Sequence, residues 1–148
     1  MGRLYSIIMD AATIAAAKDL ISVTVAADTA LILHELNVTQ ESSETSDTGV
    51  VQIHRASGTL GVGSAATPRP LDAGDAAMGG TVLTNLTTDE TEGNILLRRA
   101  WNVLSGFHWL PTPESRIVVP GQGIIVVRSD IAISSATATA ELVVEELG

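Results

Sequence analysis

The segment from Ala136 to Leu147 alternates side-chain character at every second position. One set of positions holds Ala138, Ala140, Leu142 and Val144, and the other holds Thr137, Thr139, Glu141, Val143 and Glu145. Successive side chains of a β-strand point to opposite faces of its sheet. This two-residue period therefore predicts a strand with one buried face and one polar face, and it constrains the fold more than any other pattern in the chain.

Other segments carry similar β patterns, either as alternation or as short runs of β-branched residues. They are residues 3–9, 21–25, 30–40, 50–54, 81–87, 95–103, 107–110, 117–119 and 124–127. Together with the last segment they predict about nine or ten strands, separated by turn residues. This pattern is typical of a β-sandwich, a jelly roll or a barrel.

Helix signals are few. Asp72 is a suitable N-cap for a short helix that would run to Met78 and end at the following glycines. Residues 11–17 are rich in alanine, but Thr13 and Ile14 weaken their helical propensity. Between the runs at 117–119 and 124–127, Pro120 and two glycines predict a tight turn, as a hairpin or a corner. We expect at most one short helix.

The length of 148 residues suits one domain spanning residues 1–148. Hydrophobic residues make up 45% of the chain and aromatic residues only 3%, so the core must be built from Val, Ile, Leu and Ala. Such a core buries less area per residue than an aromatic-rich one. This favours a thin sandwich that is stabilised further by contacts between copies of the chain.

Charge and composition exclude several partners. The formal net charge is −9 with only eight Lys and Arg residues, which disfavours nucleic acid as a partner. The chain has no cysteine, so disulfides and thiolate metal sites are excluded. No run of about 18 uncharged apolar residues predicts a membrane helix, and we expect no membrane partner.

Three motifs invite a catalytic or metal-binding interpretation. Asp47-Thr48-Gly49 matches the core tripeptide of aspartic proteases, but the polar residues before it favour a solvated turn over a dry catalytic loop. His34, His54 and His108 lie twenty or more residues apart, and His34 and Glu35 should point to opposite faces of a strand. We expect no enzymatic activity, no cofactor, no metal and no small-molecule substrate.

Residues 1–10 are apolar on nearly both faces of a would-be strand, with Leu4 and Ile8 on one side and Tyr5 and Ile7 on the other. This predicts an edge strand or an arm that contacts a neighbouring molecule. The two tryptophans, Trp101 and Trp109, are expected to fill the core or an interface. The predicted interface set is therefore Leu4, Tyr5, Ile7, Ile8, Trp101 and Trp109.

Three stretches carry a resemblance to a family. They are GRLYSIIMD at the start, TPRPLDAGDAAMGGTVLTNLTTDETEG in the centre, and WLPTPESRIVVPGQGIIVVRSD with TATAELVVEELG at the end. They resemble small structural proteins of tailed-phage virions, and a small, acidic, cysteine-free β protein is similar to a capsid decoration or cement protein. The resemblance implies a jelly-roll-like or tulip-like β-sandwich. It also implies a homotrimer, made in the host cytoplasm, that binds the major capsid protein on the capsid surface and stabilises the lattice.

Two further functions stay open. A tail, fibre or baseplate component would share the fold class and the trimer habit. A carbohydrate-binding module would use Trp101 and Trp109 as a stacking platform. The acidic segment Glu41 to Thr48 is predicted to be a surface loop that faces either solvent or a basic patch on a capsid subunit.

Overall fold

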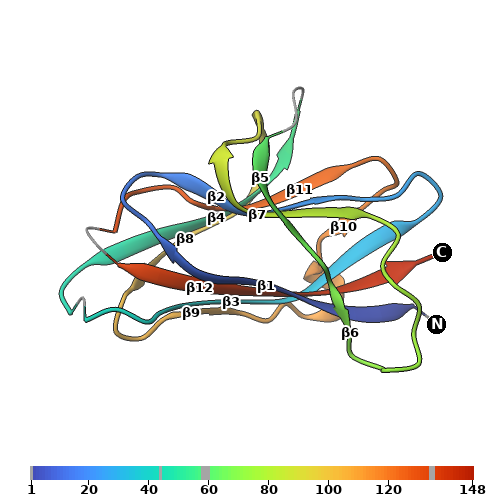
Figure 1. Cartoon of the computed structure of the whole chain (residues 1–148), viewed down its shortest axis with the longest axis horizontal. Coiled ribbons are helices and arrows are strands. Elements are labelled where there is room, and N and C mark those ends of the chain that lie inside the picture. Colours follow the sequence, from blue (N-terminus) through green and yellow to red (C-terminus); the bar gives the residue numbers. More distant parts are fainter. Residues whose placement is uncertain (1, 44, 58–60, 134–135) are drawn as a thin grey trace.

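The protein is a sandwich of two antiparallel β-sheets, seen one above the other in Figure 1. The computed structural model describes residues 2–43, 45–57, 61–133 and 136–148. Within these residues there are twelve strands and one 3-10 turn at Pro113–Ser115. The prediction of an all-β sandwich is confirmed.

The first sheet, which we call sheet A, contains both termini, and they lie side by side at one end of the molecule (Figure 1). Its strand order is β10-β3-β12-β1-β6, and β9 also pairs with β3. The strands are β1 (Arg3–Thr13), β3 (Ala30–Gln40), β6 (Arg69–Pro70), β9 (Phe107–Trp109), β10 (Val118–Val119) and β12 (Thr137–Leu147). The bounds of β3 are those predicted from the sequence.

The second sheet, sheet B, has the strand order β5-β7-β2-β11-β4-β8. Its strands are β2 (Lys18–Thr24), β4 (Thr48–Ala56), β5 (Val62–Ala66), β7 (Thr81–Thr88), β8 (Glu92–Asn102) and β11 (Ile124–Ser129). β5 and the end of β7 rise above the outer face of this sheet (Figure 1). The chain passes from sheet B to sheet A between β5 and β6 and returns at β7.

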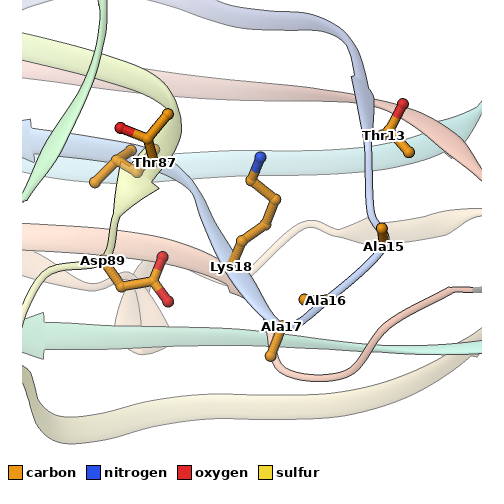
Figure 2. Close-up of a pocket in the computed structure, with 8 residues that line it drawn as sticks. Thr13, Ala15, Ala16, Ala17, Lys18, Thr87 and Asp89 are labelled. Atoms are coloured by element: carbon orange, nitrogen blue, oxygen red, sulfur yellow. The ribbon is translucent and has the colours of Figure 1, made fainter.

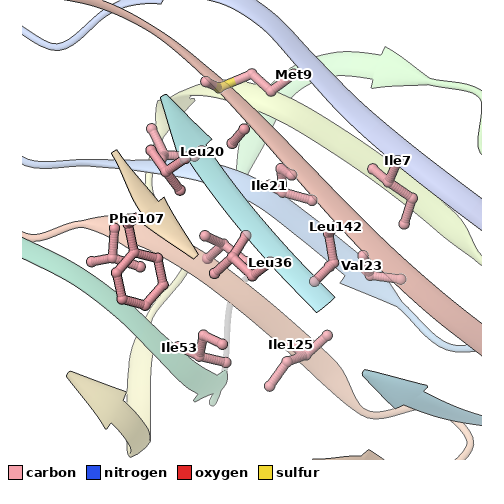
Figure 3. Packing of buried hydrophobic residues seen from close by; sticks show 14 of the residues in the cluster. Ile7, Met9, Leu20, Ile21, Val23, Leu36, Ile53, Phe107, Ile125 and Leu142 are labelled. Carbon is pink, nitrogen blue, oxygen red and sulfur yellow. The ribbon is translucent and has the colours of Figure 1, made fainter. Parts of the chain in front are cut away.

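The core lies between the sheets and consists mainly of aliphatic side chains (Figure 3). Leu142 and Leu36 from sheet A face Ile21, Ile53 and Ile125 from sheet B, and each of these is at most 1% exposed. The alternation in β12 is confirmed, because its Ala138, Ala140, Leu142 and Val144 are all buried. The core thus has the aliphatic composition that the scarcity of aromatic residues predicts.

The turn at residues 120–123 is a corner between the sheets. β10 before it pairs with β3 in sheet A, whereas β11 after it pairs with β2 and β4 in sheet B. Gln122 takes a positive φ of 64°, and a Cβ on Gly121 would lie 2.4 Å from the carbonyl oxygen of Ala27. A residue without a side chain is therefore needed at Gly121 for the close approach.

Two local predictions, the short helix after Asp72 and the number of strands, are wrong. Residues 72–78 form a turn in which the Asp72 carboxylate accepts a hydrogen bond from the Gly74 N–H, and no helix follows. Residues 11–13 continue β1 through a bulge at Ala11, which has a φ of 46°, so the alanine-rich segment is not helical. The strand count exceeds ten because β5 (Val62–Ala66) and the two-residue β6 were not predicted, the first because its segment is rich in Gly, Ser and Ala and the second because two residues show no period.

Candidate functional site

The face of sheet B that points away from sheet A carries a buried group of charged side chains. Asp19 on β2, His54 on β4 and Arg128 on β11 come from three adjacent strands, and Asp19 and His54 are 0% exposed. A register shift beside Leu20 turns both Leu20 and Ile21 toward the core and Asp19 outward. The sheet therefore places the three groups next to one another on its outer face.

Arg128 is the centre of this group. Its Nη1 donates to Asp19 Oδ1 at 2.9 Å and to Asp89 Oδ2 at 2.7 Å, and its Nε lies 3.5 Å from Asp130 Oδ1. His54 Nε2 lies 3.9 Å from Asp19 Oδ1, which is an electrostatic contact longer than a hydrogen bond. Charge-assisted bonds of this kind are stronger than bonds between neutral groups.

The segment after β7 covers the charged group. The Glu90 N–H donates to Asp19 Oδ2 at 2.7 Å, and the Asp19 N–H donates to Asp89 Oδ1 at 2.9 Å. The Glu90 carboxylate in turn accepts from Ser22 Oγ and from the Gly61 N–H, each at 2.7 Å. These bonds attach residues 88–92 and the start of β5 to the outer face of sheet B.

The electrostatics of the group favour its charged forms. Burial by itself would raise the pKa of Asp19, but interactions with His54, Arg128 and the Glu90 N–H outweigh burial and lower the pKa. Burial likewise acts to lower the pKa of His54, but the Asp19 carboxylate outweighs it and raises the pKa. The pKa of Arg128 is raised, against the effect of its burial, by Asp89 and Asp19.

The arrangement holds chain segments together, and its Asp19 and His54 side chains are closed to solvent. His54 Nε2 is buried and has no hydrogen-bond partner within the described residues, while His54 Nδ1 lies 3.3 Å from the carbonyl oxygen of Arg55. Ser22, the hydroxyl nearest in the chain to Asp19, donates to Glu90 and not to the histidine. The group thus has the geometry of an internal ionic network.

A shallow groove with a volume of about 410 Å³ lies beside this network (Figure 2). It is lined by Thr13, residues 15–17, Lys18, Leu86, Thr87 and Asp89. Both charged groups in it already have partners, because Lys18 Nζ donates to Asn85 Oδ1 and Asp89 binds Arg128. The groove therefore offers an open surface with its charges engaged inside the chain.

The outer face of sheet A is a second candidate, as an interaction surface. Leu4 and Ile8 on β1 are 37% and 52% exposed on this face. Nearby, Glu145 Oε2 lies 2.8 Å from His34 Nε2, and Glu35 Oε1 lies 3.0 Å from His108 Nε2. The face therefore combines exposed aliphatic side chains with a row of carboxylates.

A bulge in β3 shapes this face and corrects one expectation. The register between β3 and β12 shifts so that Val143 pairs with Glu35 and Val144 pairs with Leu33. His34 is the additional residue, and both His34 and Glu35 then lie on the outer face, each bonded to a residue of that face. The expectation that they point to opposite faces is wrong because strict alternation fails at a bulge.

The predicted interface residues divide into two groups. Leu4 and Ile8 are exposed, and Trp109 is half-buried against the core. Tyr5, Ile7 and Trp101 are 0%, 1% and 6% exposed and belong to the core of their own chain.

The first strand is part of sheet A and not a free arm. β1 pairs with β12 along nearly its whole length, whereas on its other side β6 pairs only with Tyr5 and Ser6, so the rest of β1 lies at an edge of the sheet within the described residues. Of the two tryptophans expected for sugar stacking, Trp101 belongs to the core and Trp109 is partly exposed.

The Asp-Thr-Gly tripeptide has a structural explanation. Gly49 pairs with Trp101 across β4 and β8, and a Cβ on Gly49 would lie 2.4 Å from Trp101 Nε1. The glycine therefore leaves the space in which the indole lies. Asp47 is part of the turn before β4, where its carboxylate accepts from the Thr48 N–H and its carbonyl oxygen accepts from the Val103 N–H. Glu44 of the acidic loop lies outside the described residues.

The three histidines lie at three different places. His34 and His108 are on the outer face of sheet A with separate carboxylates, and His54 is in the network of sheet B. In the part of the chain that the structure describes, no group of three or more His, Asp or Glu side chains could hold a metal ion. The described residues also contain no helix that could cross a membrane.

Sequence reasoning missed the ionic network. A signal was present, because Asp19 and Ser22 interrupt the apolar pattern of β2 at positions that proved to be buried. Their partners lie far away in the chain, with Glu90 68 residues from Ser22 and Arg128 109 residues from Asp19. Comparisons with protein-family models, with curated proteins and with solved structures found no match to this chain.

Proposed function

We propose that this protein is a structural component of a tailed-phage virion, most specifically a capsid decoration protein that forms trimers and binds the major capsid protein. The observation that carries the proposal is the outer face of sheet A. It presents Leu4 and Ile8 beside Glu35, Glu141 and Glu145 on a rigid sheet. A flat face of this kind fits another folded surface of complementary charge and apolarity.

The charge of the chain supports a basic and partly apolar partner surface. The net charge is −9, and Glu35, Glu141 and Glu145 all lie on this face. Each contact would be weak, but many copies on a lattice strengthen attachment through avidity. The internal network under the loops of sheet B provides the rigidity that a stabilising subunit needs.

The first experiment locates the protein. Purified particles of the phage that encodes the chain are imaged by cryo-electron microscopy, and the copy number is measured. Hundreds of copies on the shell support a decoration protein, whereas a few copies at one vertex would indicate a tail component. Absence from the particle would refute both.

The second experiment tests the surface. Ile8→Asp places a charge on the outer face of sheet A, at a side chain that is 52% exposed, so the fold should be kept. We expect this variant to lose binding to particles that lack the protein. Leu104→Asp is the matched control, because Leu104 is 67% exposed in the turn after β8 and lies outside this face. Equal binding by both variants would contradict the proposed surface.

A further inference from the structure

The edges of the two sheets differ in how they are protected. Sheet A is bordered on one side by the short strands β9 and β10 and on the other by β1, of which β6 pairs only with Tyr5 and Ser6. Sheet B is bordered by the five-residue β5 and by β8, which has eleven residues. Short edge strands and β-bulges are common protections against pairing with other chains. β8 is long, although its register with β4 is irregular at two points.

β8 is exposed along most of its length. Within the described residues it pairs only with β4, so its second edge carries unpaired backbone groups. Ile95 and Leu96 are 48% and 39% exposed on it. An edge strand with free backbone donors and acceptors and apolar side chains is suited to β-augmentation.

The contacts and register of β8 show which of its side chains lie on the outer face of sheet B. Arg98 pairs with Gln52 in the register of β4 and β8, and Glu92 Oε2 accepts from Gln52 Nε2 at 2.6 Å. Ile95 pairs with His54, which lies on the same face as Gln52. Residues three apart normally alternate faces, but the register between β4 and β8 shifts between Ile53 and His54 and again between His54 and Ala56. These two irregularities place Glu92, Ile95 and Arg98 on one face.

This spacing is self-complementary. When β8 pairs antiparallel with a second β8 about a two-fold axis through Ile95, residue 92 of each copy lies opposite residue 98 of the other. Glu92 then faces Arg98 twice, and Ile95 meets its own copy at the centre. Opposite charges at directly facing positions stabilise antiparallel pairs, and like charges destabilise them.

We propose that β8 is a self-association edge, through which two copies of this chain join their B sheets into one continuous sheet about a two-fold axis at Ile95. Arg98 has donors to spare for this contact, since one of them binds Asp130 inside the chain. Glu92 uses Oε2 for Gln52 and keeps Oε1 for the partner copy. The inference concerns the chain's own surface and goes beyond the proposed virion role, which uses the outer face of sheet A.

The contact is small, so weak two-fold association is expected, between single chains or between the proposed trimers. One pair of edge strands buries less than the roughly 1,600 Å² of a standard interface, and we expect a dissociation constant in the micromolar range or weaker. Sedimentation of the purified chain over increasing concentration measures it. On dimer formation the amides of residues 92–100 should gain protection from hydrogen exchange.

Charge reversal provides the decisive test. Arg98→Glu and Glu92→Arg should each raise the dimer dissociation constant about tenfold or more, because each pair occurs twice and attraction becomes repulsion. The double variant with both changes should return to near the wild-type value. Asp130→Asn is the control for the internal ion pair of Arg98, and it should leave the dimer unchanged.

A second variant keeps the test valid if the charge variants fold poorly. Ile95→Asp places two carboxylates at the two-fold axis and should abolish the dimer. Leu71→Asp is the control and should leave the dimer unchanged, because Leu71 is 58% exposed in the loop that follows β6 of sheet A. A monomer at all concentrations would overturn the proposal. A dimer or trimer that is insensitive to changes at residues 92, 95 and 98 would overturn it equally.

Discussion

Replacing Asp19 by Asn tests whether the ionic network of sheet B stabilises the fold. The Asp19 side chain is fully buried, and it accepts from Arg128 Nη1 at 2.9 Å and from the Glu90 N–H at 2.7 Å. Asparagine keeps the shape of the side chain but removes its charge. One carboxylate oxygen is replaced by an NH2 group, which is a donor and would face the donor that this oxygen now accepts from. His54 would then lose its main counter-charge in a buried setting, and Arg128 would lose one of its carboxylates while keeping Asp89 and Asp130.

The expected cost follows from that geometry. Removing one partner of a buried ion pair costs about 3–5 kcal/mol when the remaining charge is left uncompensated, and since Asp89 and Asp130 still compensate Arg128 we expect the lower end, about 3 kcal/mol. For a domain of this size, each kcal/mol lowers the melting temperature by about 2–4 °C, so a fall of roughly 6–12 °C is expected. Urea denaturation followed by tryptophan fluorescence measures the free energy directly.

Two controls make the result interpretable. Asp28→Asn changes an exposed carboxylate in the turn before β3 and should alter stability by no more than about 0.5 kcal/mol. The double variant Asp19→Asn with Arg128→Met should be less destabilised than the sum of the two single changes, because both charges leave together. A loss of less than about 1 kcal/mol in Asp19→Asn, or strict additivity, would refute the reasoning.

Two further predictions concern pH and packing. Because the pKa of His54 is raised, its contribution to stability is complete below the reference value of 6.5 and declines as pH rises through the folded pKa. His54→Gln should therefore remove this part of the stability loss above about pH 6.5, as measured by denaturant midpoints. The loss of stability at acid pH comes from the lowered pKa of Asp19 and should persist in the His54→Gln variant. If the loss of stability at alkaline pH were unchanged in this variant, the assignment to His54 would be contradicted. Gly49→Ala should lower stability by about 1–3 kcal/mol and shift the fluorescence of Trp101, because the new Cβ would lie 2.4 Å from the indole nitrogen. Gly74→Ala, with its nearest atom at 3.4 Å, is the control and should have little effect; equal losses would argue against the steric explanation.

Part of the candidate surfaces could be predicted from the sequence. The two-faced apolarity of residues 3–9 correctly marked Leu4 and Ile8 as side chains on one face. Which of the two faces would be buried could not be read, because both are apolar. The sandwich decided it by placing Tyr5 and Ile7 against sheet B and leaving the other face open.

The sequence by itself determined the local character of the chain. Alternation in residues 137–147, the extent of 30–40 and the turn at Pro120 are properties of neighbouring residues, and a two-residue period is legible without any partner. The fold class and the positions of most strands could therefore be predicted from the sequence. The corner at 120–123 needed more, since its two flanking runs would look the same in a hairpin.

Only the tertiary structure decided which strands are neighbours, and with that the ionic network and the free edge. Asp19, His54 and Arg128 meet because β2, β11 and β4 lie side by side, although the residues are 35 to 109 positions apart. β8 became an edge because no further strand of the described chain pairs beyond it. The pairing of distant strands depends on how whole sheets bury their apolar faces. The local pattern of one strand does not show which distant strand will pair with it.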